Sequence, residues 1–412
     1  MKLNRSVRTA TRNDGVPAPG RWISAEPGDR TRWLQTSEYT PVNVSRILEA
    51  ANEGDIAELA VAAREILERN WEVIMAMQVR KSALTGLEWD VEPGDGRQAS
   101  KDAAAAFETA LKTPDMDAAP GIVSFHGLAD HLMDAVVAPL AAAEIVWGPG
   151  GSLAGFRPVG AWHFTFRGSE TPLFVTSDTP SGIPLPPAKF IVHTHGGAGD
   201  PARAGLIRTL IWLHVFQNYP VKDLVSFVER YGMPFVVAKV DRSAWENERG
   251  VMRNLIRSFG PNGGGVFTKS TELELLQASN SGGDVYFKLL EYTSRAITKV
   301  ILGQLASSSE SGGLSGGDAQ SRVRGDLLEA DARAIESTIR IQLAAPWTKF
   351  NFGNEAAVPL LKFRNSAPED RAVFAGILET LHRAGLDADP EEISARFGLT
   401  LKRTQTVPEV RP

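Results

Sequence analysis

Two long stretches with a helical apolar period, residues 205–231 and 284–304, constrain the fold of this chain more than any other feature. In both, apolar residues recur every three to four positions, which predicts two amphipathic helices. If the first is continuous, roughly 25 residues rising 1.5 Å each extend over about 40 Å, which is longer than a small domain needs. Pro220 leaves two possibilities open, one kinked helix or two shorter ones.

A compact insert separates these two helices. The run Tyr231-Gly232-Met233-Pro234 predicts a sharp stop, and a β-α-β pattern of strand 235–240, helix 245–259 and strands 266–268 and 273–276 follows it. Arg249, Arg253 and Arg257 are spaced to share one face of the insert's helix. That face is either simply solvated or a contact for DNA or an acidic partner.

The remainder of the chain mixes helices with short strands, which predicts an α+β fold. A first helix is expected from Asp55 to Gly86, and a long one from Asp318 to Leu343, stopped by Pro346. Further helices are predicted over 99–112, 124–138 and 369–384, and strands over 87–91, 142–147, 155–158, 162–166, 173–175, 189–193 and 360–363. Residues 1–40 read as an extended arm with scattered basic residues, either a solvated tail or a contact for a neighbouring subunit or DNA phosphates.

A stretch composed almost entirely of serine and glycine follows the second long helix. It consists of Ser307, Ser308, Ser309, Glu310, Ser311, Gly312, Gly313, Leu314, Ser315, Gly316 and Gly317. This composition has little to bury and much conformational entropy to lose, so it predicts a mobile loop. The stretch contains two enzyme-like patterns, and neither has the context that its chemistry needs. The run 314–320 imitates an ABC-type ATPase signature, but the chain has no phosphate-binding loop. Gly313 to Gly317 fits G-x-S-x-G, but no buried strand precedes Ser315.

His193 and His195 form the one metal-like pair in the sequence. Two residues apart on a strand, they share a face, and two imidazoles can bind one metal ion. A catalytic zinc site needs a third ligand, and no other histidine has the spacing to provide it. We therefore predict no metal, no cofactor and no catalytic residue. The alternative left open is a metal-dependent or serine hydrolase that uses these histidines or Ser315.

Composition excludes several classes of protein. Cysteine is absent, so there is no disulfide, thiolate nucleophile or cysteine-bound zinc. No apolar run approaches the roughly 20 residues that cross a bilayer, and we expect no membrane association. The net charge of −5 argues against a generally basic nucleic-acid-binding protein. It permits a DNA conduit, because phosphate contacts would retard a sliding duplex.

Several landmarks follow one another along the chain. They are the strands 143–147 and 162–166, the run 185–190, Gly205 to Arg208 with Trp212 and Lys222, the run 227–234, Ile301 to Gln304 before the serine-rich stretch, and Gln342-Leu343 with Pro346 and Asn351. In this order and spacing they resemble the Mu-type portal proteins of tailed phages and prophages. The resemblance covers roughly residues 55–385.

This resemblance implies a ring, usually dodecameric, and a division of the chain into segments. The expected segments are an N-terminal arm (1–40), a wing (41–204), a first stem helix (205–231), a clip (232–278), a second stem helix (279–304), a tunnel loop (305–320) facing DNA, the return of the wing (321–364), and a reduced crown and tail (365–412). The clip, with Arg249, Arg253 and Arg257, would meet the other components of the particle.

The implied role is a channel for packaging and ejecting double-stranded DNA at one capsid vertex, without catalysis. The implied partners are further copies of the chain, DNA, the terminase large subunit, a head-completion or adaptor protein, and the major capsid or scaffolding protein. The implied location is the virion, with assembly in the host cytoplasm. A non-portal structural scaffold protein is the second alternative, and it differs from the portal in forming no ring.

Overall fold

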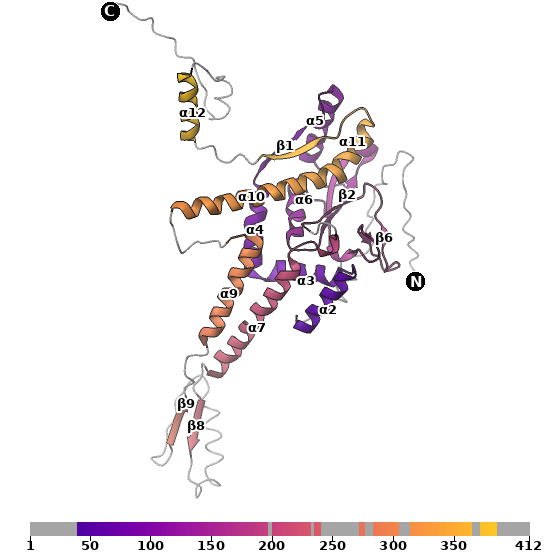
Figure 1. Cartoon of the computed structure of the whole chain (residues 1–412). Helices are drawn as coiled ribbons and strands as arrows, with labels where there is room; N and C mark the ends of the chain where they lie inside the picture. The colour runs from indigo at the N-terminus through magenta and orange to yellow at the C-terminus, as the bar shows by residue number, and fades with distance from the viewer. Residues whose placement is uncertain are drawn as a thin grey trace, which may run out of the picture. The chain divides into compact units, whose positions relative to one another are not determined.

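The computed structural model describes residues 39–196, 200–231, 235–239, 272–276, 283–304, 314–364 and 371–384 (Figure 1). These residues form a mixed helix and sheet fold, as the sequence predicts. The chain divides into two units, Met1–Phe363 and Arg364–Pro412. The second unit contributes one described helix, α12 (Arg371–Arg383).

The first unit begins with three consecutive helices, where the sequence predicted one. They are α2 (Pro41–Asn52), α3 (Ala57–Arg69) and α4 (Trp71–Thr85). The prediction of one helix from Asp55 to Gly86 is wrong because Asn70 interrupts it. Asn70 has an extended backbone, and its Oδ1 accepts hydrogen bonds from the N–H groups of Glu72 and Val73. A side chain that caps a new helix thus overrides a continuous apolar stripe.

The centre of the unit is a three-stranded antiparallel sheet in the order β3-β2-β7. Its strands are β3 (Leu153–Val159), β2 (Ala141–Trp147) and β7 (Phe190–His193). Every residue of β2 is buried, as expected for a central strand covered on both faces. One apolar core joins this sheet to the helices α3, α4 and α6 (Phe125–Leu132).

Smaller elements surround this sheet. The 3-10 helix Met133–Val136 continues α6, and α5 (Gln98–Lys112) packs on β1 (Glu88–Glu92). Strand β1 pairs with β10 (Leu360–Arg364). A second small sheet contains β4 (Phe164–Thr165), β5 (Leu173–Phe174) and β6 (Ile183–Pro184). The predicted strand 162–166 is therefore shorter than expected, because the 3-10 turn Ala161–His163 occupies its first residues.

The first predicted long helix is a single helix. Helix α7 (Ile207–Tyr231) continues through Pro220, although proline has no N–H to donate to the carbonyl of Phe216. The second is α9 (Gly283–Leu302), which packs along α7 (Figure 1). Between them, β8 (Phe235–Lys239) and β9 (Glu272–Leu276) pair antiparallel. The predicted insert helix 245–259 lies outside the described residues.

The last long helix starts earlier and continues further than predicted. Helix α10 (Leu314–Ile339) passes through a π-helical turn (Arg340–Ala344) into α11 (Ala345–Phe352). Pro346 does not stop this helical path: it lies in the first turn of α11, directly after the π-helical turn, where the spacing of the backbone hydrogen bonds changes. Among the described helices, none is long and apolar enough to span a bilayer.

Candidate functional site

The α7–α9 pair is anchored at one end in the apolar core. Ile207, Leu210 and Ile211 in the first turns of α7 are fully buried, as are Ile297 and Ile301 in the last turns of α9. The two helices therefore emerge from the α/β body as a supported pair.

A buried polar network fixes α7 against its neighbours at the same level. Asn70 donates from Nδ2 to Gln217 Oε1 over 2.7 Å and to His214 Nδ1 over 3.0 Å. Gln217, almost fully buried, donates in turn to Ser294 Oγ on α9 at 3.4 Å. The residue that separates α3 from α4 thus also links them to α7. Burial lowers the pKa of His214, which favours the neutral ring in this network.

On another face of these same turns, α7 carries an aromatic strip in which Trp212 is half-buried and Phe216 and Tyr219 are exposed. Trp212 and Phe216 stack with ring centroids 6.1 Å apart, and Tyr219 continues the same face one turn later. Phe216 and Tyr219 are 49% and 44% exposed, although large aromatic side chains strongly favour burial. We call Trp212, Phe216 and Tyr219 the α7 strip.

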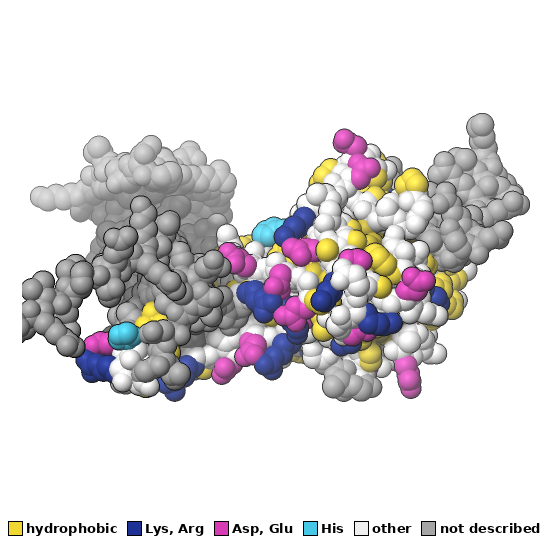
Figure 2. All heavy atoms as spheres, turned by 90° about the horizontal axis from the view of Figure 1, so that it is seen from above, with side chains coloured by type: hydrophobic (Ala, Val, Ile, Leu, Met, Phe, Trp, Pro, Cys, Tyr) yellow, Lys and Arg dark blue, Asp and Glu magenta, His cyan; other side chains and the backbone are white. Residues whose placement is uncertain are grey.

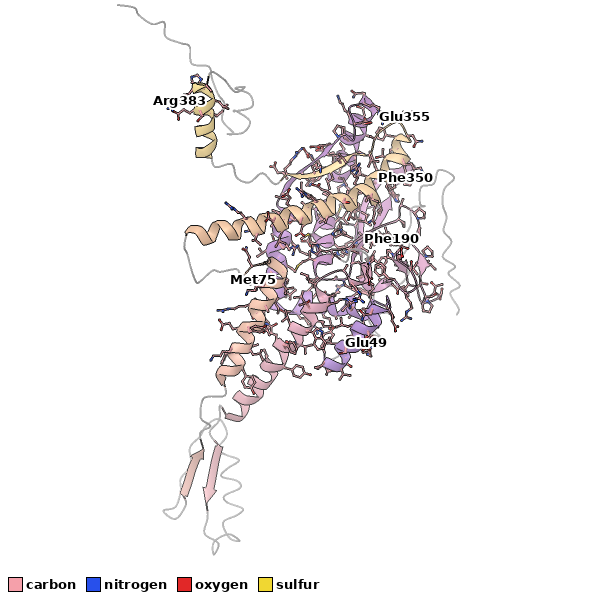
Figure 3. All side chains as sticks on the ribbon, in the orientation of Figure 1. Glu49, Met75, Phe190, Phe350, Glu355 and Arg383 are labelled. Carbon is pink, nitrogen blue, oxygen red and sulfur yellow. The ribbon has the colours of Figure 1, made fainter. Side chains whose placement is uncertain are left out.

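Further exposed apolar side chains lie on α9 and on α4, and these two helices pack against each other. Leu289 and Tyr292 lie on α9, and Tyr292 is 68% exposed. On α4, Trp71, Met75 and Val79 repeat every four residues and are all exposed (Figure 3, where Met75 is labelled). We call these five residues the α4–α9 strip. Two exposed apolar strips on one subunit indicate surfaces that a partner covers.

A buried ion pair holds the end of α9 to α4 and α10. Arg80 Nε and Nη2 donate to Asp331 Oδ2 and Oδ1 over 2.6 and 2.7 Å, and Arg80 Nη1 donates to the carbonyl of Ile301 over 2.7 Å. Both side chains are more than nine-tenths buried. The carbonyl lies in the last turn of α9, where backbone acceptors have no intrahelical partner. Arg80 therefore fixes the point at which the chain leaves α9.

The two histidines of the metal-like pair belong to this junction. His195 Nδ1 lies 3.8 Å from Asp331 Oδ1, and His193 Nδ1 lies 2.8 Å from Thr338 Oγ1 on α10. Burial, reinforced by neighbouring His195, lowers the pKa of His193 to about 4. Burial and the Arg80 charge also lower the pKa of His195. Both rings are neutral near pH 7.

These histidines hold helix α10 to the end of β7. Within the described part of the chain, no group of three or more His, Asp or Glu side chains is arranged to hold a metal ion. Ser315, the other residue of the hydrolase alternative, lies in the first turn of α10. Nothing in this arrangement favours a hydrolase.

The π-helical turn supports the outer edge of the central sheet. Gln342 accepts from the N–H of Val192 over 2.7 Å and donates to the carbonyl of the same residue over 2.8 Å. Val192 lies in β7, whose other edge pairs with β2. The Gln342 side chain thus makes the two hydrogen bonds that a further strand would otherwise make with Val192. The widened π-helical turn places this side chain against the edge of the sheet.

The predicted DNA-contacting loop is shorter than the sequence suggested. Leu314, Ser315, Gly316 and Gly317 lie in α10, whose backbone is helical from Leu314. Serine and glycine are tolerated at this place because the first turn of a helix needs few intrahelical hydrogen bonds. Residues 307–313 lie outside the described residues, as do Arg249, Arg253 and Arg257.

Sequence reasoning missed the two strips and the buried junction. The α7 strip had a visible signal, because a helix that is apolar on more than one face has more than one packing partner. The buried junction had no visible signal in the sequence, because Arg80 and Asp331 are 251 residues apart.

The surface charge of the described residues is mixed. On the face that Figure 2 shows, Lys and Arg side chains alternate with Asp and Glu and form no broad patch of one sign. Among the described residues, opposite charges also pair along single helices, such as Arg333 with Glu329 and Arg64 with Glu68. Such a face has no field that would hold a DNA duplex by its phosphates.

Residues 61–399 match the profile of the family described as the portal protein of Mu bacteriophage. The Mu-like prophage FluMu protein gp29 of Haemophilus influenzae is 27% identical over 358 residues, which cover 84% of this chain and 68% of that protein. The portal protein of Escherichia phage Mu is 26% identical over 342 residues, which cover 78% of this chain and 63% of that protein.

A solved structure has the same fold. It is the neck of a native GTA particle computed with C12 symmetry, which matches with a TM-score of 0.51 at 10% identity. The match covers 88% of this chain and 94% of that one.

Proposed function

Because this chain belongs to the family of Mu bacteriophage portal proteins, we propose that its copies form a closed ring at one vertex of a phage or prophage capsid. Double-stranded DNA passes through this ring during packaging and ejection. The ring has twelve subunits, a number supported by the C12 symmetry with which the structurally similar neck was computed.

The observation that carries the ring is the pair of exposed strips. A two-fold dimer needs one self-complementary patch, whereas a closed ring needs two different patches that meet head to tail. The α7 strip and the α4–α9 strip lie on different helices of one subunit, and each contains apolar side chains that are exposed in the single chain. In the ring, the α7 strip of one copy covers the α4–α9 strip of the next.

In this ring the α7–α9 pair forms the stem and lines the channel. Helix α7 has 25 residues, which at 1.5 Å each give a length of roughly 38 Å. Residues 41–204 and 321–364 form the wing, residues 232–278 the clip, and residues 365–412 a reduced crown and tail. Residues 305–313 and the first turn of α10 form the tunnel loop, since they follow directly on the end of α9.

The partners follow from this arrangement. The clip, with Arg249, Arg253 and Arg257, meets the terminase large subunit during packaging and a head-completion or adaptor protein afterwards. The wing faces the major capsid or scaffolding protein. Assembly takes place in the host cytoplasm, and the finished ring remains in the virion. The ring positions DNA and catalyses no reaction. A hydrolase or a non-portal scaffold has no specific observation in its favour.

The strips give a direct test. Truncation by Phe216→Ala removes a phenyl group that the ring would bury, a loss of roughly 1.5–3 kcal/mol at each subunit contact. We expect the concentration at which rings half-dissociate, measured by mass photometry, to rise tenfold or more. The control is Arg97→Ala, which removes an exposed partner of Asp95 outside both strips. If the two variants assemble equally well, the α7 strip is not part of the contact between subunits.

A further inference from the structure

A cleft lies on the wing. No described residue of the stem helices α7 and α9, and no residue of either strip, lines it. It encloses about 690 Å³ between α3, α4, α6 and the strands β2 and β3. The apolar side chains that line it, which we call its floor, include Leu67, Met77 and Val159, and Trp162 also lines the cleft. A site of this volume and lining is large enough for one or two bulky apolar side chains.

The rim of the cleft carries carboxylates that remain open to solvent. Lys81 Nζ lies 2.9 Å from Asp130 Oδ2 and 2.8 Å from Asp134 Oδ1. The Asp130 side chain is still 48% exposed, and that of Glu68, which pairs with Arg64 over 2.7 Å and also lines the cleft, is 55% exposed. A cation that approaches the rim therefore finds two accessible carboxylates.

Trp162 already accepts one cation on its ring face. The guanidinium of Arg64 lies 5.1 Å from the centroid of the indole. The cleft thus combines an apolar floor, an aromatic side chain and a rim on which three carboxylates outnumber the two cations Arg64 and Lys81. This combination fits a peptide in which arginines flank a large apolar residue.

The chain enters the described structure at α3, the helix that forms one side of this cleft. The Tyr39 hydroxyl donates to Glu65 Oε2 over 2.6 Å, and Glu65 lies on α3 between Arg64 and Leu67, which line the cleft. The run Arg30-Thr31-Arg32-Trp33-Leu34 ends shortly before Tyr39 in the sequence. The connection of about five residues extends over at most about 18 Å, which is more than the 10–12 Å diameter of a helix.

We propose that this cleft binds residues 30–34 of its own chain. Trp33 and Leu34 contact the apolar floor, and Arg30 and Arg32 pair with Asp130 and Glu68. The short connection to Tyr39 favours the segment of the same chain over that of another copy, because a tether of this length gives an effective concentration in the millimolar range. This contact fixes the N-terminal arm on the wing independently of ring formation.

The absence of cysteine makes a crosslinking test clean. The full-length double variant Leu34→Cys/Gln78→Cys places one thiol in the segment and one on the exposed cleft face of α4. The control, Leu34→Cys/Thr109→Cys, places the second thiol on the exposed surface of α5 instead. Disulfide formation under mild oxidation is followed on non-reducing gels and located by mass spectrometry of the peptides.

We expect the cleft pair to form an intrachain disulfide at least tenfold faster than the control pair. Adding Trp33→Ala to the cleft pair should slow its formation about tenfold, with the melting temperature unchanged. Equal rates for the cleft and control pairs would overturn the proposal. A disulfide predominantly between chains would also overturn it, since the cleft would then hold the segment of another copy.

Discussion

At the scale of single residues, Arg80 joins three separate parts of the fold. Its guanidinium pairs with Asp331 through two hydrogen bonds and satisfies the Ile301 carbonyl with a third. A planar guanidinium provides such a fork of donors, whereas a lysine ammonium offers no fixed geometry. Arg80 therefore holds the end of α9 to the middle of α10 through contacts of its own, which do not involve the segment that links the two helices in the sequence.

Replacing Arg80 should lower the stability of the folded protein, because the Asp331 carboxylate would then be buried without its cation. We expect Arg80→Ala to lower the free energy of unfolding by about 3–5 kcal/mol, measured by urea denaturation. The comparison is Arg295→Ala, whose exposed pair with Glu291 should contribute less than about 1 kcal/mol. Similar losses in both variants would show that the Arg80 pair has no special role.

His193 should make the stability of the protein dependent on pH. Its pKa is about 4 in the folded protein and about 6.5 when exposed, so the unfolded chain binds a proton more readily. The stabilising neutral form is present above pH 6.5, and its contribution is lost as the pH falls from 6.5 towards 4.

We expect His193→Gln to reduce the loss of stability between pH 7 and pH 4 by roughly 3 kcal/mol. Urea denaturation of the wild-type and variant proteins at both pH values measures this difference. His126→Gln, at an exposed position, serves as the control. An unchanged pH dependence in the His193 variant would show that this ring is not held in its neutral form by the fold.

At the scale of elements, the edge of β7 depends on a single side chain. Replacing Gln342 by leucine leaves the N–H and carbonyl of Val192 without their partner, at a cost of about 2 kcal/mol. We expect Gln342→Leu to accelerate hydrogen exchange of the Val192 amide by tenfold or more. Gln98→Leu on the exposed start of α5 should leave this amide unchanged. Unaltered exchange in the Gln342 variant would contradict the role of the π-helical turn.

The period of the apolar residues predicted most described helices, because apolar residues recur on the face of a helix that is buried. It located α5, α7, α9 and β2 within a few residues. It failed where one side chain redirects the backbone, as Asn70 does between α3 and α4. It also missed α2, where Thr40 caps a helix with Pro41 in its first turn. The contacts between distant residues, such as Arg80 with Asp331, carry no periodic signal.

At the scale of the whole molecule, the tunnel loop should face DNA without holding it. The variant with Ser308, Ser309 and Ser311 replaced by lysine adds three positive charges to each subunit of the ring. We expect it to bind double-stranded DNA with an affinity that falls steeply with salt concentration, because each phosphate contact releases counterions. The matched variant with asparagine at the same positions should bind as weakly as the wild type.

Fluorescence anisotropy of a labelled duplex at two salt concentrations measures this difference on assembled rings. If the lysine variant gains no salt-dependent binding, residues 308–311 do not face the duplex, and the tunnel-loop assignment fails.

In the proposed assembly, the two strips of neighbouring subunits meet and the ring closes. The most direct measurement is the mass of the purified wild-type assembly by native mass spectrometry. Twelve copies of a 44.6 kDa chain predict a particle of roughly 535 kDa with a closed symmetry. A particle that remains at 44.6 kDa, or at the mass of a dimer, at the highest soluble concentration would contradict the account.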